Sequence, residues 1–469
     1  MKTIRGRASV LTVPTLMAAA LVLAMSGCTA SEQAYDPAAH QFLPDPSPLQ
    51  VQNGVPVLTQ EQALADYDYM WSILTDNAAV VQEMENDPAW SGEKPSDMQA
   101  GSRSYFTADP TMSLSAFNDA IKLSLAPLQE KSHIYVLDDN YRQMWMYNYT
   151  DGWADTTTPQ SAEMLAAFGR LASLNSTAKT DEYYKQLYYP GGPAPTSSTA
   201  SSSNTSSEPS AADITRAQLF LITNILTSMK GNTPYLKVSS FMDPSFTDPS
   251  NTSVIVAYHS VLSDYLTQFF TENKDASDLI IDIRGNGGGS PKIWEDYLYG
   301  LLAAPDQTHQ WTITGGFPMG GLNDYVWQDA YPLSPDQAGW AGDFAAGALD
   351  RFDRVFRETY TEQSSLNGIG YKGKIWLLVD GGTFSAGDQF TVFCEQTGFA
   401  TVVGTPTGGA GMDSRIESFP LPNSGLLISY SAWCGINQDG TCNDLVGTAP
   451  DIDVGEQNAL DVVLAQIGQ

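Results

Sequence analysis

The chain has 469 residues, which exceeds the length of one small domain, and 42% of them are hydrophobic. It holds 53 acidic and 23 basic side chains, so its formal net charge at pH 7 is −30. A charge of this sign and size repels nucleic acids and anionic membrane surfaces, which excludes nucleic-acid binding as the main function.

Residues 1–27 have the pattern of an export signal. Three basic residues open the chain, and an apolar stretch follows from Val10 to Met25; the basic residues are Lys2, Arg5 and Arg7. Cys28 comes directly after small residues, as in a lipobox, which predicts cleavage before Cys28 and a lipid on its sulfur. Two other readings are an ordinary cleaved signal and a retained membrane helix, although Pro14 and the short apolar run argue against a spanning helix. The polar residues that follow predict a flexible tether over residues 28–55, and the anchor predicts a membrane location on the extracytoplasmic face.

The next part of the chain reads as mostly helical. Apolar residues at spacings of three and four predict helices over 59–85 and 113–128, a short strand follows at 132–137, and further helices are expected at 160–190 and 213–229. Residues 191–212 are rich in Pro, Ser and Thr and predict a disordered insertion. We therefore expect a helical N-terminal subdomain over 56–140 and a helical region with the insertion over 141–232.

From residue 233 to 469 apolar strands alternate with helices, which predicts an α/β core. The expected strands are 235–240, 253–258, 278–284, 374–380, 400–404 and 426–433. The expected helices are 260–273, 290–303, 385–397 and 457–467. The segment 305–370 has no clear period, and we expect a long excursion there.

Cysteine is sparse in this chain. Cys434 and Cys442 flank a short segment with a turn signal, so a local disulfide is one expectation outside the cytoplasm, and Cys394 is expected to be a buried thiol. No CxxC or His–Cys cluster indicates zinc, and we expect neither metal nor cofactor.

A glycine-rich turn follows the apolar strand at 279–283. Gly285, Gly287, Gly288 and Gly289 lie before a predicted helix, where bare backbone N–H groups can bind negative charge. A phosphate-binding loop would need a lysine where Ser290-Pro291 stands, and a dinucleotide fingerprint would need another glycine and an earlier strand. An oxyanion hole fits the sequence, and a tight packing turn is the plain structural alternative. Asp282 and Arg284 of the same string are expected to be structural.

A serine stands at a second strand-to-helix turn. The strand 375–379 is followed by Asp380-Gly-Gly-Thr383, and Ser385 then opens a helix that Gly398 would end. The helix dipole there favours a developing alkoxide, and the N–H of Ala386 can reach the same oxyanion. An N-cap serine is the structural alternative.

The string Asp-Ile-Arg-x-Asn-x-Gly-Gly (282–289) and the turn Thr-x-Ser-Ala-x-Asp (383–388), about a hundred residues apart, together resemble peptidase family S41. This family includes the C-terminal processing proteases and the tricorn core protease. The resemblance covers 60–137 loosely and 233–456 well, and no PDZ-like pattern appears between His133 and Pro234. It implies a ClpP/crotonase-like α/β core with a helical N-terminal subdomain, and a serine nucleophile at Ser385.

The base that activates the serine has two forms in this family. No lysine follows Lys374, so the Ser–Lys pair of the processing proteases is not expected. The resemblance to the tricorn branch implies His133 as base with Ser132 beside it, and Asp444 in the place of a family glutamate that orients them. Asp444 is one methylene shorter than that glutamate, so a surface-loop role is the alternative. The other histidines are expected to have no catalytic role; they are His40, His259 and His309.

The expected function is a lipid-anchored serine endopeptidase that acts on peptides or proteins through an acyl-enzyme. The oxyanion hole would be formed by the amides of Gly287 or Gly288 with that of Ala386. Two alternatives stay open, a non-catalytic binding lipoprotein on the same fold and an esterase-like serine hydrolase.

Overall fold

A computed structural model describes residues 48–88, 90–129, 131–147, 159–188, 209–248, 251–327, 333–365, 367–412 and 416–468. The chain divides into two compact units, 1–41 and 42–469, and every described residue belongs to the second unit. The export signal, Cys28 and residues 191–208 of the insertion lie outside the described residues. Within the described ranges, no helix has the length and apolar character needed to cross a membrane.

The first described elements are two strands that overlap the predicted tether. β1 (Gln50–Gln52) pairs antiparallel with β2 (Val55–Thr59), which also pairs with β3 (Thr111–Ser113). β1 and the first residue of β2 thus lie within the tether predicted over 28–55. The expected helix 59–85 is divided at Ala78 into α1 (Gln60–Asn77) and α2 (Ala79–Asn86).

The helices that follow build the predicted N-terminal helical part. They are α3 (Pro95–Ser102), α4 (Leu114–Gln129), α5 (Asp139–Tyr147), α6 (Pro159–Asn175) and α7 (Ala178–Tyr188). Aromatic side chains from α1, α4 and α7 join one buried core, among them Tyr67, Trp71, Phe117 and Tyr184. Burial of such large side chains is the main stabilising term for these short helices.

The C-terminal part is built on a six-stranded sheet of order β14-β10-β9-β6-β5-β4. Its strands are β4 (Ile225–Lys230), β5 (Thr233–Val238), β6 (Asp278–Asp282), β9 (Lys374–Val379), β10 (Thr401–Gly404) and β14 (Ile452–Asp453). Only the β4–β5 pair of this sheet is antiparallel. The parallel strands are connected through helices, as the alternating pattern predicted.

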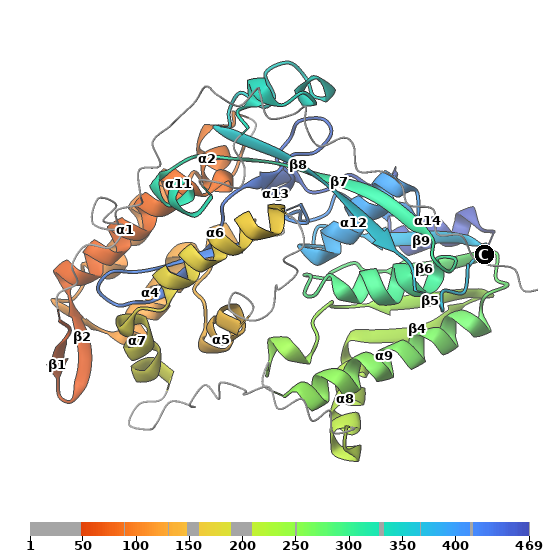
Figure 1. The fold of residues 1–469 in the computed structure, drawn as a ribbon, viewed down its shortest axis with the longest axis horizontal. Helices are drawn as coiled ribbons and strands as arrows, with labels where there is room; N and C mark the ends of the chain where they lie inside the picture. Colours follow the sequence, from red (N-terminus) through yellow and green to blue (C-terminus); the bar gives the residue numbers. More distant parts are fainter. Residues whose placement is uncertain are drawn as a thin grey trace, which may run out of the picture. The chain divides into compact units, whose positions relative to one another are not determined.

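Helices cover both faces of this sheet. Ile280 of β6 packs against α14 (Ala459–Gln466), whereas its neighbours Leu279 and Ile281 belong to the larger core with α9 (Thr252–Glu272) and α12 (Ala386–Thr397). Successive residues of a strand point to opposite faces, so one strand supports both layers. The predicted α/β core is confirmed, and Figure 1 shows its elements in chain colours.

Two expected elements of the core are of another type. The predicted strand 253–258 is the first part of α9, where the Asn251 side chain accepts from the Val254 N–H and caps the helix. Conversely, the predicted helix 213–229 ends early, because α8 (Ala211–Asn224) gives way to β4. Tertiary pairing with β5 outweighs the helical pattern of residues 225–229.

The segment 305–370 contains regular structure that its sequence did not reveal. β7 (Thr308–Phe317) and β8 (Arg354–Gln363) pair antiparallel along their whole length, and α11 (Gly321–Trp327) lies between them in the chain. The expected helix 290–303 is a π-helical stretch, Ile293–Tyr299, followed by α10 (Gly300–Leu302). β7 also pairs with β13 (Cys434–Gly435).

A separate two-stranded sheet lies next to the candidate site. β11 (Ile416–Pro420) pairs antiparallel with β12 (Leu427–Ser431), and the short helix α13 (Asn443–Val446) follows β13.

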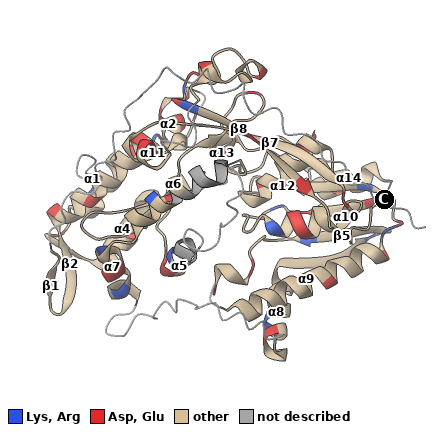
Figure 2. Ribbon diagram, viewed as in Figure 1, with Lys and Arg blue, Asp and Glu red and all other residues tan. Residues whose placement is uncertain are grey.

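Acidic residues occur along the described chain from the α1 region to the C-terminal sheet and do not gather on one element (Figure 2). The negative charge therefore marks no single element as a binding site.

Candidate active site

Ser385 lies in a strained turn between β9 and α12. Its backbone has φ 54° and ψ −124°, a left-handed value that non-glycine residues rarely adopt. Neighbouring segments hold the turn, since the Ser385 N–H donates to Gly409 O at 2.9 Å and the Phe384 N–H donates to Asn286 O at 2.9 Å. Strain of this kind costs about 1–3 kcal/mol and is found where a side chain must be presented in one direction.

The side chain of His133 reaches this serine. His133 Nε2 lies 3.0 Å from Ser385 Oγ, although the two residues are 252 positions apart in the chain. The imidazole ring also lies 5.3 Å from the Phe384 ring, centroid to centroid, and His133 is only 7% exposed. A nucleophile and a base within hydrogen-bond distance in a nearly buried setting are the geometry of nucleophilic catalysis.

Strand β12 positions the histidine. The Ser429 hydroxyl donates to His133 O at 2.7 Å, and the Ser429 N–H donates to Tyr135 O at 2.9 Å. Val136 then forms an antiparallel bridge with Ile428. The segment predicted as a strand at 132–137 therefore lies along β12, which fixes the backbone that carries the imidazole.

The glycine turn lies against the nucleophile turn. A Cβ placed on Gly288 would be 2.8 Å from Ser385 Cβ and 3.0 Å from Ala386 N, so only glycine fits without displacement. The Gly288 N–H itself donates to Asn286 Oδ1 at 2.9 Å. This hydrogen bond occupies the Gly288 N–H. Of the three amides expected in the oxyanion hole, those of Gly287 and Ala386 are then left as the two donors.

Ser132 and Asp444 have contacts of their own. Ser132 is buried, and its hydroxyl donates to Leu128 O at 3.0 Å. Asp444 is also buried, and its Oδ2 accepts from the Gly435 N–H at 3.0 Å. The burial of Asp444 therefore does not agree with the surface-loop alternative. A part for Asp444 in a relay with His133 stays a prediction.

Asp388 has a positioning role that the sequence reasoning missed. The carboxylate is fully buried, and it accepts from the Thr407 hydroxyl and, at 2.9 Å, from the Gly411 N–H. Both donors belong to the segment whose Gly409 carbonyl accepts from Ser385. Burial raises the pKa of the Asp388 carboxyl, and the hydrogen bonds from Thr407 and Gly411 oppose that shift. The only sequence signal was its place in the motif Thr-x-Ser-Ala-x-Asp.

Asp282 and Arg284 form a network at the end of β6. Arg284 Nη2 lies 2.7 Å from Asp282 Oδ2, and the Tyr235 hydroxyl donates to the same oxygen at 2.6 Å. Burial alone would raise the pKa of Asp282, but the hydrogen bonds from Arg284 and Tyr235 outweigh it, so the pKa lies below its ordinary value. The contacts fit the expected structural role, since they fix the strand end before the glycine turn.

The other described histidines are bonded elsewhere. His259 Nδ1 lies 3.0 Å from the Tyr297 hydroxyl, and His309 Nδ1 lies 3.0 Å from the Tyr299 hydroxyl. His40 lies outside the described residues.

One group of side chains with metal-ligand chemistry occurs within the described ranges. The sulfurs of Cys434 and Cys442 and a carboxylate oxygen of Asp444 lie within 4.8 Å of one another, and all three residues are buried. The sequence showed no metal motif here, because the spacing matches no common zinc pattern.

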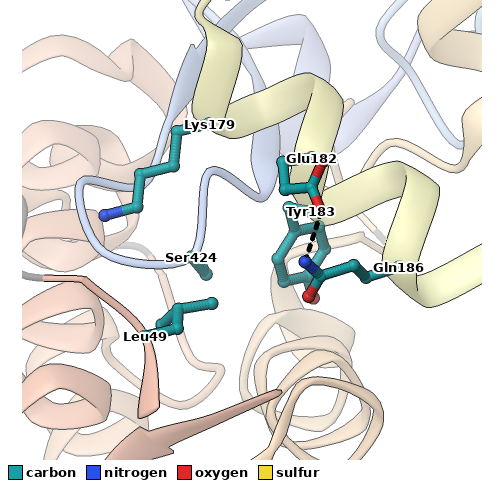
Figure 3. Close-up of a pocket in the computed structure, with 6 residues that line it drawn as sticks. All are labelled: Leu49, Lys179, Glu182, Tyr183, Gln186 and Ser424. Carbon is teal, nitrogen blue, oxygen red and sulfur yellow. Dashed lines mark hydrogen bonds between the residues drawn. The ribbon is translucent and has the colours of Figure 1, made fainter. Parts of the chain in front are cut away.

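A cavity of about 250 Å³ lies away from these residues (Figure 3). It is lined by Leu49, Lys179, Glu182, Tyr183, Gln186 and Ser424. A single hydrogen bond, from Gln186 Nε2 to Glu182 Oε1, joins the side chains drawn. Neither Ser385 nor His133 lines this cavity, so it is not the candidate active site.

Comparison with known proteins gives matches of unequal strength. A curated Chlamydia pneumoniae protein, CPj1016/CpB1054, is 32% identical over 85 residues, which is 18% of this chain and 14% of that protein. The chain thus matches about one seventh of that relative. Among solved structures, one described as a peptidase from Parabacteroides merdae has 14% identity and a TM-score of 0.45, with 88% of this chain and 98% of that chain covered.

Two further solved structures are similarly distant. Mature CPAF has 14% identity and a TM-score of 0.42 over 84% of this chain and 93% of its own. The photosystem II D1 C-terminal processing protease has 13% identity and a TM-score of 0.35 over 90% and 98%.

A further match is to the sequence profile of peptidase family S41, and it covers residues 232–454. These residues include five strands of the six-stranded sheet (all but β4), the glycine turn and Ser385. Residues 232–454, a little less than half of the chain, therefore match peptidase family S41, a family of serine-type peptidases.

Proposed function

We propose that this protein is a lipid-anchored serine endopeptidase that works outside the cytoplasm with Ser385 as nucleophile and His133 as base. The observation that carries the proposal is the 3.0 Å separation of His133 Nε2 and Ser385 Oγ in a nearly buried setting. A neutral imidazole at this distance accepts the serine proton as Oγ attacks the carbonyl carbon of a peptide bond.

The first half-reaction forms an acyl-enzyme. As the Oγ–C bond forms, the peptide C=O becomes an oxyanion, for which the N–H groups of Gly287 and Ala386 are the proposed donors. His133 then gives its proton to the leaving amine, and the C–N bond breaks. In the second half-reaction water attacks the ester, His133 takes the water proton, and Ser385 regains it when the acid product leaves.

Asp444 and Ser132 are proposed to orient His133. Both are buried; Ser132 directly precedes His133 in the chain, and Asn443, the neighbour of Asp444, has its carbonyl oxygen against Gly409. Orienting groups contribute less than the groups they orient, so we expect Asp444→Ala to lower kcat by roughly ten- to a thousandfold. Retention of full activity by Asp444→Ala would remove it from the relay, and Asp444→Glu should keep activity if the family geometry holds.

A fluorophosphonate probe tests the nucleophile and base directly. We expect wild-type protein to be labelled on Ser385, Ser385→Ala to be unlabelled, and His133→Ala to be labelled several orders of magnitude more slowly. His259→Ala serves as the matched control, because that histidine bonds to Tyr297 elsewhere in the fold. Absence of labelling in wild-type protein would favour a non-catalytic binding lipoprotein instead.

Substrate preference separates the two hydrolase alternatives. A peptidase is expected to cleave internal bonds of unfolded polypeptides, measured by mass spectrometry of the fragments. Hydrolysis of small esters with no cleavage of any polypeptide would favour the esterase-like alternative.

The anchor is tested separately from the chemistry. Cys28→Ala should leave the export signal unprocessed or release the protein from membranes, and labelling of the wild-type amino terminus should show a diacylglyceryl cysteine. Unchanged membrane association together with an intact, uncleaved amino terminus on the wild-type protein would point instead to a retained helix, without affecting the peptidase proposal.

A further inference from the structure

Two cysteines face one another in a short hairpin behind the active site. Cys434 begins this hairpin on β13, Cys442 ends it, and both are buried, with exposures of 0% and 3%. The structure holds both as thiols. Their sulfurs, together with a carboxylate oxygen of Asp444, lie within 4.8 Å of one another.

The backbone of the hairpin explains this proximity. Ile436 forms an antiparallel bridge with Cys442, and the turn between them is closed by hydrogen bonds from the Asn437 N–H to Thr441 O and from the Gly440 N–H to Asn437 O. Cys434 lies two residues before Ile436 on the same strand, so their side chains share one face of the hairpin. Cys442 lies directly opposite Ile436 and therefore projects from that same face.

The hairpin supports the nucleophile turn through the next residue. A Cβ on Gly409 would be 2.1 Å from Asn443 O, which means that the two backbones are in tight contact. Gly409 O in turn accepts from the Ser385 N–H. Any loosening of the hairpin is therefore transmitted to the serine through two backbone contacts.

We propose that Cys434 and Cys442 form a disulfide bond in the exported protein, and that this bond clamps the hairpin against the nucleophile turn. The compartment rests on the proposed function, since disulfides persist outside the cytoplasm. One cysteine thiolate attacks an external disulfide, such as that of a dithiol oxidase or oxidised glutathione, and releases one thiol. The second cysteine then attacks the mixed disulfide and releases the other thiol, so two electrons and two protons leave the cysteine pair.

The order of events follows from burial. Both sulfurs are enclosed in the folded protein, so the bond forms while the hairpin is still accessible during folding. Once folded, the bond is shielded from dissolved reductants. We therefore expect dithiothreitol to reduce it in urea and to leave it intact under native conditions.

Thiol counting tests the bond independently of any peptidase activity. The exported full chain is unfolded in urea with iodoacetamide and no reductant, and its peptides are analysed by mass spectrometry. We expect Cys394 to be alkylated and Cys434 to be recovered linked to Cys442, with both alkylated only after reduction. Alkylation of both without reductant would overturn the proposal. One equivalent of zinc, with thiols released by a chelator alone, would overturn it in favour of a Cys434–Cys442–Asp444 metal site.

The clamp is tested with the double variant Cys434→Ser/Cys442→Ser. We expect its melting temperature to fall by about 3 °C and fluorophosphonate labelling of Ser385 to slow by about threefold. Cys394→Ala removes a buried thiol on α12 and leaves the hairpin intact, so its labelling rate should match wild type. A double variant with wild-type stability and labelling would refute the clamp even if the bond exists.

Discussion

Replacing Gly288 by alanine should displace the nucleophile without touching the reacting atoms. The added Cβ would lie 2.8 Å from Ser385 Cβ and 2.9 Å from Phe384 O, whereas ordinary contacts begin at 3.4 Å. The serine turn, or the glycine turn, must therefore move by at least roughly 0.6 Å. Gly288 also has φ +98°, so alanine there adds about 1–3 kcal/mol of backbone strain.

The size of the effect follows from the displacement. Misplacement of a reacting group by about 1 Å can cost about a hundredfold in rate. A shift of just over half that distance should slow fluorophosphonate labelling of Ser385 by roughly ten- to a hundredfold, with a modest loss of thermal stability.

The control is a second glycine that also has a positive φ, but with open space where a Cβ would lie. Gly285 has φ +72°, and no atom lies within 4 Å of a Cβ placed there. Gly285→Ala therefore carries backbone strain without the push on Ser385. Labelling rates are measured for folded protein at one probe concentration, and folding is checked by circular dichroism. If Gly288→Ala and Gly285→Ala label at rates within about twofold of each other, the steric argument fails.

Three further outcomes are expected. Ser429→Ala removes the donor to His133 O and should destabilise the protein by about 1–3 kcal/mol in urea unfolding while it slows labelling of Ser385; unchanged labelling would show that β12 does not position the histidine. In Asp388→Asn, Ser385 should be labelled at a rate within about threefold of wild type, because burial already favours a neutral side chain and an amide can keep the hydrogen bond from Gly411. In Asp388→Ala, labelling of Ser385 should be about tenfold slower than in wild type. Equal losses of labelling rate in the two variants would contradict this reasoning. The pKa of Asp282 is lowered in the folded protein, so its ionised carboxylate stabilises the fold above its unfolded pKa of about 4, and this stability is lost on acidification. The unfolding free energies of wild type and Asp282→Asn should therefore converge as the pH falls. A difference that stays constant with pH would refute this linkage.

Local sequence patterns predicted those strands and helices that consist of one continuous apolar run with a clear stop. The strand Leu279–Ile283 and the helix after Ser385 have continuous apolar runs with clear stops, and the structure has β6 and α12 within a few residues of them. The run Ser253–Tyr258 is rich in β-branched residues, but capping by Asn251 and a buried helical face made it part of α9.

Other elements depend on partners that the sequence does not reveal. β4 is an edge strand with Leu226 and Met229 exposed, so it lacks the alternation of a half-buried strand. β7 and β8 are joined through a long connection, and their pairing becomes visible only in three dimensions. His133 could be selected only through family resemblance, because no spacing rule relates residues 252 positions apart. The positions of Asp388 and Asn286 depend on long-range hydrogen bonds that no local pattern encodes.

The way in which His133 is held has a consequence for the life of the chain before it is complete. The histidine lies along β12, which is synthesised almost three hundred residues later, at Leu427–Ser431. Neither the serine turn alone nor the helical N-terminal part alone contains both reacting groups. A nascent chain therefore has no assembled nucleophile–base pair with which to damage its neighbours. Its reactivity appears only when the last third of the molecule has folded onto the first.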